Sequence, residues 1–255
     1  MNVPVDDRGF LLGDGLFETI LFEAGNLHHF TAHADRMIRG CAILGLPPPG
    51  LQALEIAALN EVRAAGLTET RAAVRLTWTA GSGGRGLDRP DDPQPRLVVS
   101  AAPSAKPVTP ARLVTVAIRR NEGSPVSRIK SLNYLDNVLA RRAARQAGAD
   151  EALMLNNRGE IAGAAVANLF WFEGDTLLTP SLECGVLDGI MRGEVIARAR
   201  RVGVQVVEIV ALPERLGAAR GLFLTNSLIG IRAVESLDGT TVNPHPATAL
   251  LSSLT

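Results

Sequence analysis

The chain has 255 residues, of which 46% are hydrophobic and 20% charged, and its 26 basic and 26 acidic side chains give a formal net charge of zero. This composition is typical of a globular protein, and the length allows one large domain or two smaller ones with a sizeable core. A balanced charge gives no reason to expect a nucleic-acid partner.

No apolar run reaches the roughly 18 residues that a membrane-spanning helix needs, so we expect no membrane association. Residues 1–8, MNVPVDDR, are acidic and polar where a signal peptide is basic and then apolar. Cys41 and Cys184 match no metal or redox spacing, and the histidines at 28, 29 and 33 have no second group of ligands nearby. We therefore expect a cytoplasmic protein without a metal site.

The first hundred residues are expected to mix strands and helices. Residues 15–23 alternate as a strand does, and Gly25-Asn26 is typical of a hairpin turn. Apolar residues recur at helical spacing over 31–44, and Gly45 ends that pattern. Further predicted elements are a helix over 51–65, strands over 71–79 and 96–101, and a glycine-rich loop over 81–86.

Prolines 103, 107 and 110 punctuate the middle of the chain. They indicate a linker over 108–118 between a small α+β domain, 1–107, and a larger domain, 119–255. In the larger domain we predict helices over 131–147, 190–202 and 247–251, and strands over 151–155, 167–173, 176–179, 205–210 and 221–225. The fold class is therefore α/β with α+β character.

Lys130 stands at the start of the predicted helix 131–147, whose other basic residues are arginines. A lysine amine can lose its proton and form an imine, whereas arginine stays protonated. Lys130 is therefore either a solvated loop residue or an imine-forming catalytic amine.

Three other segments could bind a phosphate. The amides of Gly189, Ile190 and Met191 open a predicted helix, although Asp188 could simply cap it. Asn226 and Ser227 follow an apolar strand, where they could equally form a turn. Arg36 could be a phosphate donor or could pair with a surface carboxylate such as Asp35.

Arg85 lies in Gly81-Ser82-Gly83-Gly84-Arg85-Gly86, which lacks the Lys-Ser/Thr ending of an NTPase loop. The segment is either a mobile loop that presents Arg85 to a carboxylate or a plain hairpin loop. A lysine, several phosphate donors and an arginine together fit pyridoxal 5′-phosphate, which needs an amine partner, a phosphate site and a substrate anchor.

The chain resembles the class IV aminotransferase family, which has pyridoxal-phosphate fold type IV. The resemblance extends over nearly the whole chain. It rests on DRGF at 7–10, GDGLFET at 13–19, HxxR at 33–36, IKSLN at 129–133, DEA at 150–152, ANLF at 167–170, GIMR at 189–192 and TNSL at 225–228. It implies a small α+β domain, a larger α/β pseudo-barrel, a homodimer with the cofactor between domains, and small amino-acid and 2-oxo-acid substrates.

The resemblance also implies roles for individual residues. Lys130 would be the Schiff-base lysine and would carry the proton between substrate Cα and cofactor C4′. Arg36 would bind the phosphate together with the Ile190 and Met191 amides and the Ser227 hydroxyl. Three roles are more peripheral: Leu187 packing on the pyridine ring, Arg85 clamping the substrate carboxylate across the dimer, and Tyr134 approaching the phenolic oxygen.

The chain departs from the family at Gly163. Family members have a glutamate five residues before the position of Asn168, where it keeps the pyridine nitrogen protonated. Glu160 lies three residues earlier and would face the other side of an extended strand. Three explanations compete for the glycine at this position. They are an engineered substitution, a natural variant with a weaker electron sink, and a degraded paralogue. Our hypothesis is that the chain binds the cofactor but transaminates slowly.

Three functions remain open at the level of sequence. The first is transamination between an amino acid, of the D series, and a 2-oxo acid. The second is the lyase reaction that converts 4-amino-4-deoxychorismate to 4-aminobenzoate and pyruvate, which the 81–86 and 225–228 segments resemble. The third is a cofactor-binding protein without useful turnover, supported by Gly163 alone.

Overall fold

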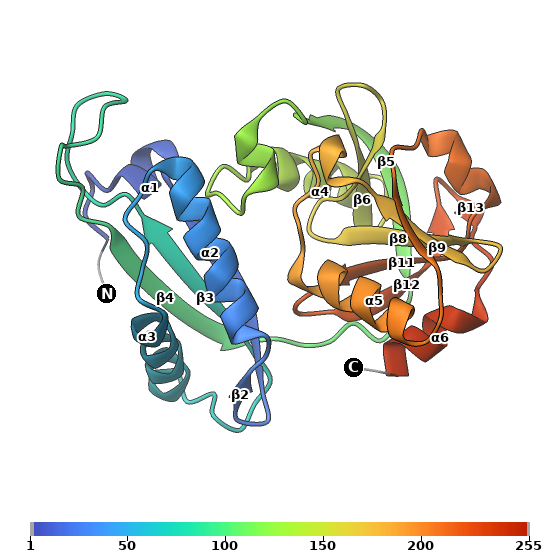
Figure 1. The fold of residues 1–255 in the computed structure, drawn as a ribbon, viewed down its shortest axis with the longest axis horizontal. Helices are drawn as coiled ribbons and strands as arrows, with labels where there is room; N and C mark the ends of the chain where they lie inside the picture. Colours follow the sequence, from blue (N-terminus) through green and yellow to red (C-terminus); the bar gives the residue numbers. More distant parts are fainter. Residues whose placement is uncertain (1–2, 254–255) are drawn as a thin grey trace. The chain divides into compact units, whose positions relative to one another are not determined.

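The computed structural model describes residues 3–253, apart from the side chain of Ser253. Met1 and Asn2, on which the signal-peptide argument partly depends, lie outside the described residues. The chain forms two compact units (Figure 1). The first comprises the chain up to Lys106 together with Ile129–Asn133, and the second comprises Pro107–Arg128 and the chain from Tyr134 onward.

The first unit is an antiparallel sheet of order β2-β1-β3-β4 with helices packed against it. Alternate residues of β1, such as Leu16 and Ile20, point into a core that also receives Ala34, Met37 and Cys41 of α2. The elements are α1 Arg8–Leu12, β1 Gly15–Glu23, β2 Asn26–Leu27, α2 Phe30–Leu44, α3 Leu51–Ala64, β3 Ala72–Thr79 and β4 Arg96–Pro103.

The segment Ile129–Asn133 belongs to the first unit because its backbone pairs with the start of β1. Phe17 N donates to Lys130 O at 2.9 Å, and Leu132 N donates to Gly15 O at 3.0 Å. The predicted helix 131–147 was therefore wrong at its start, since α4 spans Leu135–Gln146. The backbone groups that would have formed its first turn are bonded to a strand more than 100 residues away in sequence.

The second unit is a strongly curled mixed sheet of order β10-β9-β8-β11-β12-β5-β6-β7, with β13 paired to β12. The pairs β9–β10, β12–β5 and β5–β6 are parallel. Its strands are β5 Ala111–Arg120, β6 Glu151–Asn156, β7 Ile161–Ala164, β8 Asn168–Glu173, β9 Thr176–Pro180, β10 Val206–Ile209, β11 Arg220–Asn226, β12 Gly230–Leu237 and β13 Thr240–Thr241. Its α-helices are α4, α5 Ile190–Arg201 and α6 Pro246–Ser253, and short 3-10 turns span Pro125–Arg128, Leu182–Cys184 and Pro213–Ala218.

Strand β8 is buried on both faces, which explains its unbroken apolar sequence. Leu169 and Trp171 pack into one cluster, whereas Phe170 and Phe172 pack into another that includes Val195 of α5. A third cluster lies under α4 and includes Ala140, Ala144 and Met154. The strand is thus fixed from both sides, which holds Asn168 at its first position.

The range expected to be a linker, 108–118, mostly forms β5. The prolines precede this strand, and its buried positions Ala111, Leu113 and Val116 show that it is part of a packed sheet. Helix α1 and strands β7 and β12 were not predicted, because each is short or rich in glycine or charge.

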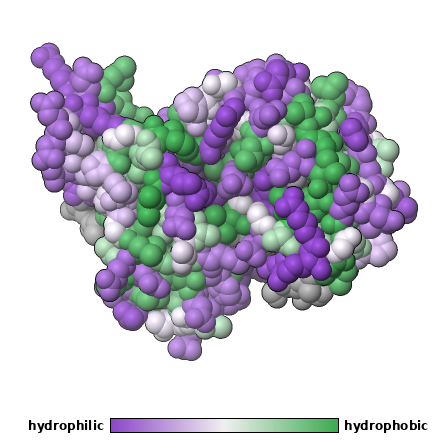
Figure 2. All heavy atoms as spheres, in the orientation of Figure 1, coloured by the Kyte–Doolittle hydropathy of each residue, from purple (hydrophilic) through white to green (hydrophobic). Residues whose placement is uncertain are grey.

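Within residues 3–253, no helix is long and apolar enough to cross a membrane. Hydrophilic and hydrophobic residues are interspersed over the visible face (Figure 2).

Candidate active site

Lys130 is held by its backbone at the edge of β1, and its side chain lies over an aromatic ring. The Nζ atom is 4.1 Å from the centroid of Phe17. This distance places the ammonium in cation–π range of the ring. The sequence contains only one other lysine, Lys106, which is exposed. Any chemistry that needs a lysine amine on a fixed backbone therefore falls to Lys130.

Next to Phe17 in β1, Glu18 joins Arg36 and His33 in a buried cluster. Arg36 donates from Nε to Oε1 at 2.8 Å and from Nη2 to Oε2 at 2.6 Å. The His33 Nδ1 atom lies 2.7 Å from the same Oε2. Burial by itself raises the pKa of Glu18, but the hydrogen bonds from Arg36 and His33 outweigh it and hold that pKa at about 2.

The pKa of His33 lies below its ordinary value in this cluster. Burial lowers its pKa, the hydrogen bond to Glu18 opposes that change, and the positive charges of Arg36 and Lys130 add to the lowering. The amine of Lys130 thus lies within electrostatic range of His33. Arg36 and Lys130 come together in the first unit, through the adjacent β1 residues Glu18 and Phe17.

In the second unit, α5 begins with Gly189, not Asp188, as its N-cap. Gly189 makes no side-chain capping hydrogen bond. Asn168 Nδ2 donates to Leu187 O at 2.9 Å, and a Cβ on Gly189 would lie 2.0 Å from Asn168 Oδ1. Any other residue at position 189 would therefore require the Asn168 side chain to move. The amides of Ile190 and Met191 carry the positive end of the helix dipole, which attracts an anion.

The turn that contains Ser227 is tied to the same region. Thr225 pairs with Asn168 across β11 and β8. Asn226 Nδ2 donates to Val166 O at 2.9 Å, and its Oδ1 accepts from the amides of Leu228 and Ile229. Both ends of the Asn226 side chain are thus used to shape the turn. We expect its contribution to a phosphate site to be the placement of Ser227.

Gly163 lies beside this region in β7, opposite Met154. Its φ is +101°, and the adjacent Ala164 N donates to Ala167 O at 2.9 Å. A Cβ at Gly163 would lie 3.5 Å from Ala167 O, so space is available but the backbone conformation favours glycine. Glu160 is engaged elsewhere, because its Oε2 accepts from Asn156 and Arg158 at 2.6 and 2.8 Å.

Tyr134 and Arg85 occupy different surroundings. Tyr134 lines a cavity of about 510 Å³ in the second unit with Asn137, Arg141 and Val166. Arg85 is exposed on its loop in the first unit, and its side chain has no hydrogen bond or ion pair with any described residue. Such a guanidinium is accessible to an anionic ligand.

The sequence argument did not single out Glu18, His33 or Asn168 as site residues. A signal for Glu18 was present, since a carboxylate inside an apolar strand needs a buried partner. Nothing local shows that the amide of Asn168 positions a helix that starts about 20 residues later.

Comparison with known proteins identifies the class of enzyme. The sequence profile described as amino-transferase class IV matches residues 15–237. The chain belongs to the class IV aminotransferase family, and its fold is the type IV fold, as the sequence predicted.

Its relatives have different activities. It is 33% identical over 246 residues to a putative branched-chain-amino-acid aminotransferase of Methanocaldococcus jannaschii, covering 95% of this chain and 85% of that protein. It is 30% identical over 253 residues to a D-alanine aminotransferase of Listeria monocytogenes, covering 94% and 84%. The crystal structure of a putative 4-amino-4-deoxychorismate lyase from Legionella pneumophila has a TM-score of 0.93 and 31% identity, and covers 100% of this chain and 94% of that one.

The family uses pyridoxal 5′-phosphate, and the residues present fit that group. The second unit offers the N-terminus of α5, where Gly189 is the N-cap and lies against Asn168, next to the turn that carries Ser227. The first unit offers a buried arginine and a lysine amine on a fixed backbone. At position 163, which the sequence resemblance assigns to the pyridine nitrogen, this chain has a glycine and so offers no carboxylate.

Proposed function

We propose that the chain is a pyridoxal-phosphate-dependent aminotransferase that exchanges an amino group between an amino acid, of the D series, and a 2-oxo acid. The observation that carries this proposal is the placement of Lys130. Its backbone is bonded to β1, and its amine lies over Phe17 and within electrostatic range of His33.

The residues have separate tasks in this proposal. Bound pyridoxal phosphate supplies an electron sink for the pair of electrons left when the substrate Cα loses its proton. Lys130 carries that proton between the substrate Cα and the cofactor C4′. Arg36, oriented by Glu18, and the first amides of α5 hold the phosphate, and the Ser227 hydroxyl adds a further donor.

Leu187 and Tyr134 have positions consistent with a supporting role. Leu187 is partly buried, and its carbonyl is fixed by Asn168, so we propose that it packs on the pyridine ring. Tyr134 is the only tyrosine in the chain, and we propose that it approaches the phenolic oxygen. Arg85 binds the substrate carboxylate, in a homodimer where it reaches the partner chain's site.

The glycine at position 163 leads us to expect slow transamination. Without a carboxylate at the pyridine nitrogen, the ring is a weaker acceptor of electrons. The chain therefore retains the cofactor but transaminates more slowly than relatives with a glutamate there.

The second candidate function is the lyase reaction that gives 4-aminobenzoate and pyruvate from 4-amino-4-deoxychorismate. The similarity to the Legionella pneumophila protein favours it. It uses the same lysine and cofactor, so the site residues above do not discriminate between the two functions.

One experiment separates the candidates. The purified holoprotein is mixed with D- and L-amino acids without an acceptor, and conversion of the cofactor to its aminated form is followed by absorbance. A transaminase converts stoichiometrically with its substrate and reverses with a 2-oxo acid. In a parallel mixture with 4-amino-4-deoxychorismate and no acceptor, release of 4-aminobenzoate and pyruvate supports the lyase instead. If neither reaction occurs, the result supports a binding protein without turnover.

A further inference from the structure

Asp14 is the centre of a charged cluster in the first unit, which we call the Asp14 cluster and which consists of Arg8, Asp14 and Arg89. Arg8 Nε and Arg89 Nε each donate to Asp14 Oδ2 at 2.9 Å, and Arg89 Nη2 bonds to Oδ1. Burial raises the pKa of Asp14, but the bonds from Arg89 and Arg8 outweigh that effect and lower it. The carboxylate is therefore ionised and holds both guanidinium groups.

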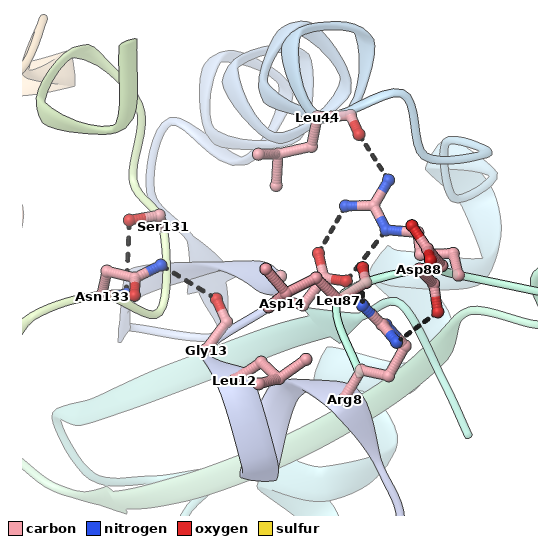
Figure 3. A pocket seen from close by; sticks show the side chains of 11 residues that line it. Arg8, Leu12, Gly13, Asp14, Leu44, Leu87, Asp88, Ser131 and Asn133 are labelled. Atoms are coloured by element: carbon pink, nitrogen blue, oxygen red, sulfur yellow. Dashed lines mark hydrogen bonds and ion pairs between the residues drawn. The ribbon is translucent and has the colours of Figure 1, made fainter. Parts of the chain in front are cut away.

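The two arginines hold the loop that carries Arg85. Arg8 donates to the carbonyls of Asp88 and Leu87 at 2.9 and 2.8 Å, and its own amide donates to Gly81 O at 2.8 Å. Arg85 forms a backbone bridge with Asp88 inside the loop. Arg85 is thus linked to Asp14 by a chain of contacts: its backbone bridges to Asp88, whose carbonyl binds Arg8, and Arg8 pairs with Asp14. Figure 3 shows Asp14 and Arg8 beside Leu87 and Asp88.

The same cluster is adjacent to the segment that holds Lys130. Asp14 directly precedes Gly15, whose carbonyl accepts from Leu132 N, and Gly13 O accepts from Asn133 Nδ2 at 3.1 Å. Ser131 and Asn133 line a cavity of about 520 Å³ together with Asp14 and Arg89 (Figure 3). One carboxylate therefore connects the backbone that places the lysine with the loop that places the exposed arginine.

We propose that Asp14 is a positioning residue: through Arg8 and Arg89 it holds loop 81–89 so that Arg85 is presented to the carboxylate of the amino-acid substrate. This inference rests on the proposed function. A loop with glycines at 81, 83, 84 and 86 has high conformational entropy when released, and an arginine on it would then pay an ordering cost at each binding event.

The test compares Asp14→Asn with Asp91→Asn in the holoenzyme. Asp91→Asn removes the same charge from an exposed site close to the loop and outside the Asp14 cluster. The first readout is the rate of tryptic cleavage at Arg85–Gly86, followed by mass spectrometry. Trypsin does not cut after Arg89, because Pro90 follows it. The second readout is KM against kcat for the amino-acid substrate, with Arg85→Gln as the reference.

We expect Asp14→Asn to speed cleavage at Arg85–Gly86 at least tenfold and to raise KM at least tenfold while kcat changes less than threefold. Asp91→Asn should leave the cleavage rate and KM within twofold of the values for the unmodified protein. If Asp14→Asn does not fold, Arg89→Gln replaces it in the test, because it keeps the Arg8–Asp14 pair. We expect this variant to raise both the cleavage rate and KM about threefold.

Unchanged cleavage in a folded Asp14→Asn protein overturns the inference. The inference is also overturned if Arg85→Gln raises KM but Asp14→Asn, although cleaved faster, leaves KM unchanged. Absence of turnover in the unmodified protein counts against the proposed function instead, and the cleavage rates then still decide whether Asp14 holds the loop.

Discussion

Glu18 and Arg36 form a two-point ion pair inside the first unit, with side chains 1% and 9% exposed. The pair joins β1 to α2 and uses the Nε and Nη2 atoms of the arginine. Such parallel bonds fix the plane of the guanidinium as well as its position. The orientation of the proposed phosphate-binding arginine is therefore set by the protein itself.

Replacing Glu18 with glutamine should disturb both stability and cofactor binding. Glutamine cannot accept two charge-assisted bonds, and Arg36 would keep a buried charge without its counter-ion. We expect the free energy of unfolding to fall by about 3 kcal/mol. We also expect the affinity for pyridoxal phosphate to fall at least tenfold, as measured by urea denaturation and by titration of the apoprotein.

Glu23→Gln is the matched control, because Glu23 lies on the same strand and pairs with Arg71 while 46% exposed. Its loss should cost no more than about 1 kcal/mol and leave cofactor affinity unchanged. Equal effects of the two substitutions would contradict the assigned role of Glu18.

Acidification should destabilise the first unit in two stages. The pKa of His33 lies below its ordinary 6.5, so the unfolded chain takes up a proton there first, and stability falls as the pH drops from 6.5. The pKa of Glu18 is about 2 against an ordinary 4.5, so a second loss follows as the pH falls from 4.5 towards 2.

The measurement is the free energy of unfolding as a function of pH for the unmodified protein, His33→Gln and His28→Gln. His33→Gln should flatten the slope just below pH 6.5, because its side chain no longer titrates. His28 is exposed, and its replacement should leave the slope unchanged. A slope insensitive to His33→Gln would show that this histidine is not buried in its neutral form.

Lys130 should be the only attachment site for the cofactor. Borohydride reduction of the holoprotein, digestion and mass spectrometry should find the pyridoxyl group on the Lys130 peptide alone. The sequence supplies its own control, since Lys106 is the one other lysine. Lys130→Ala should abolish labelling and lower transamination by at least a thousandfold, and Lys106→Ala should change neither. Labelling at Lys106 would contradict the assignment.

Local patterns predicted those elements whose contacts lie on one face of one segment. The apolar stripe of α2 and the alternation of β1 were read correctly, because each element packs on its neighbours in the same unit. The start of α4 was wrong, since Leu132 fits the helical stripe of the residues that follow but its amide bonds to β1. Pairing between distant segments leaves no trace in local spacing.

The site shows the same division. Lys130 and the first amides of α5 could be proposed as site groups from sequence, because their chemistry depends on residue type and on a helix terminus, and they stay predictions. The Asp14–Arg89 pair joins residues 75 apart, and neither residue lies in a pattern that points to the other. Glu18 and Arg36 each lie inside a recognised motif, but only the fold shows that one orients the other.

Gly163 offers a direct test of the electron-sink hypothesis, and its positive φ determines the control. Any side chain at φ +101° strains the backbone, so Gly163→Ala should cost about 1–2 kcal/mol of stability. Gly163→Glu carries the same strain and adds a carboxylate. We expect half-transamination to be at least tenfold faster in Gly163→Glu than in Gly163→Ala. No difference in rate or cofactor retention between the two variants would reject the hypothesis.

The start of α5 can be tested with two glycines of the same region. A Cβ at Gly189 would lie 2.0 Å from Asn168 Oδ1, so Gly189→Ala must displace Asn168 and break its bond to Leu187 O. We expect a loss of about 1–3 kcal/mol in stability and at least a tenfold loss in affinity for pyridoxal phosphate.

Gly193→Ala adds the same methyl group one turn further along α5, where nothing lies within 4 Å of the new Cβ. It should raise stability by about 0.5–1 kcal/mol, because alanine favours the helix, and leave cofactor affinity within twofold. The comparison therefore separates a general effect on the helix from an effect on its terminus. If Gly189→Ala retains pyridoxal phosphate as well as Gly193→Ala does, the phosphate is not bound at the first amides of α5.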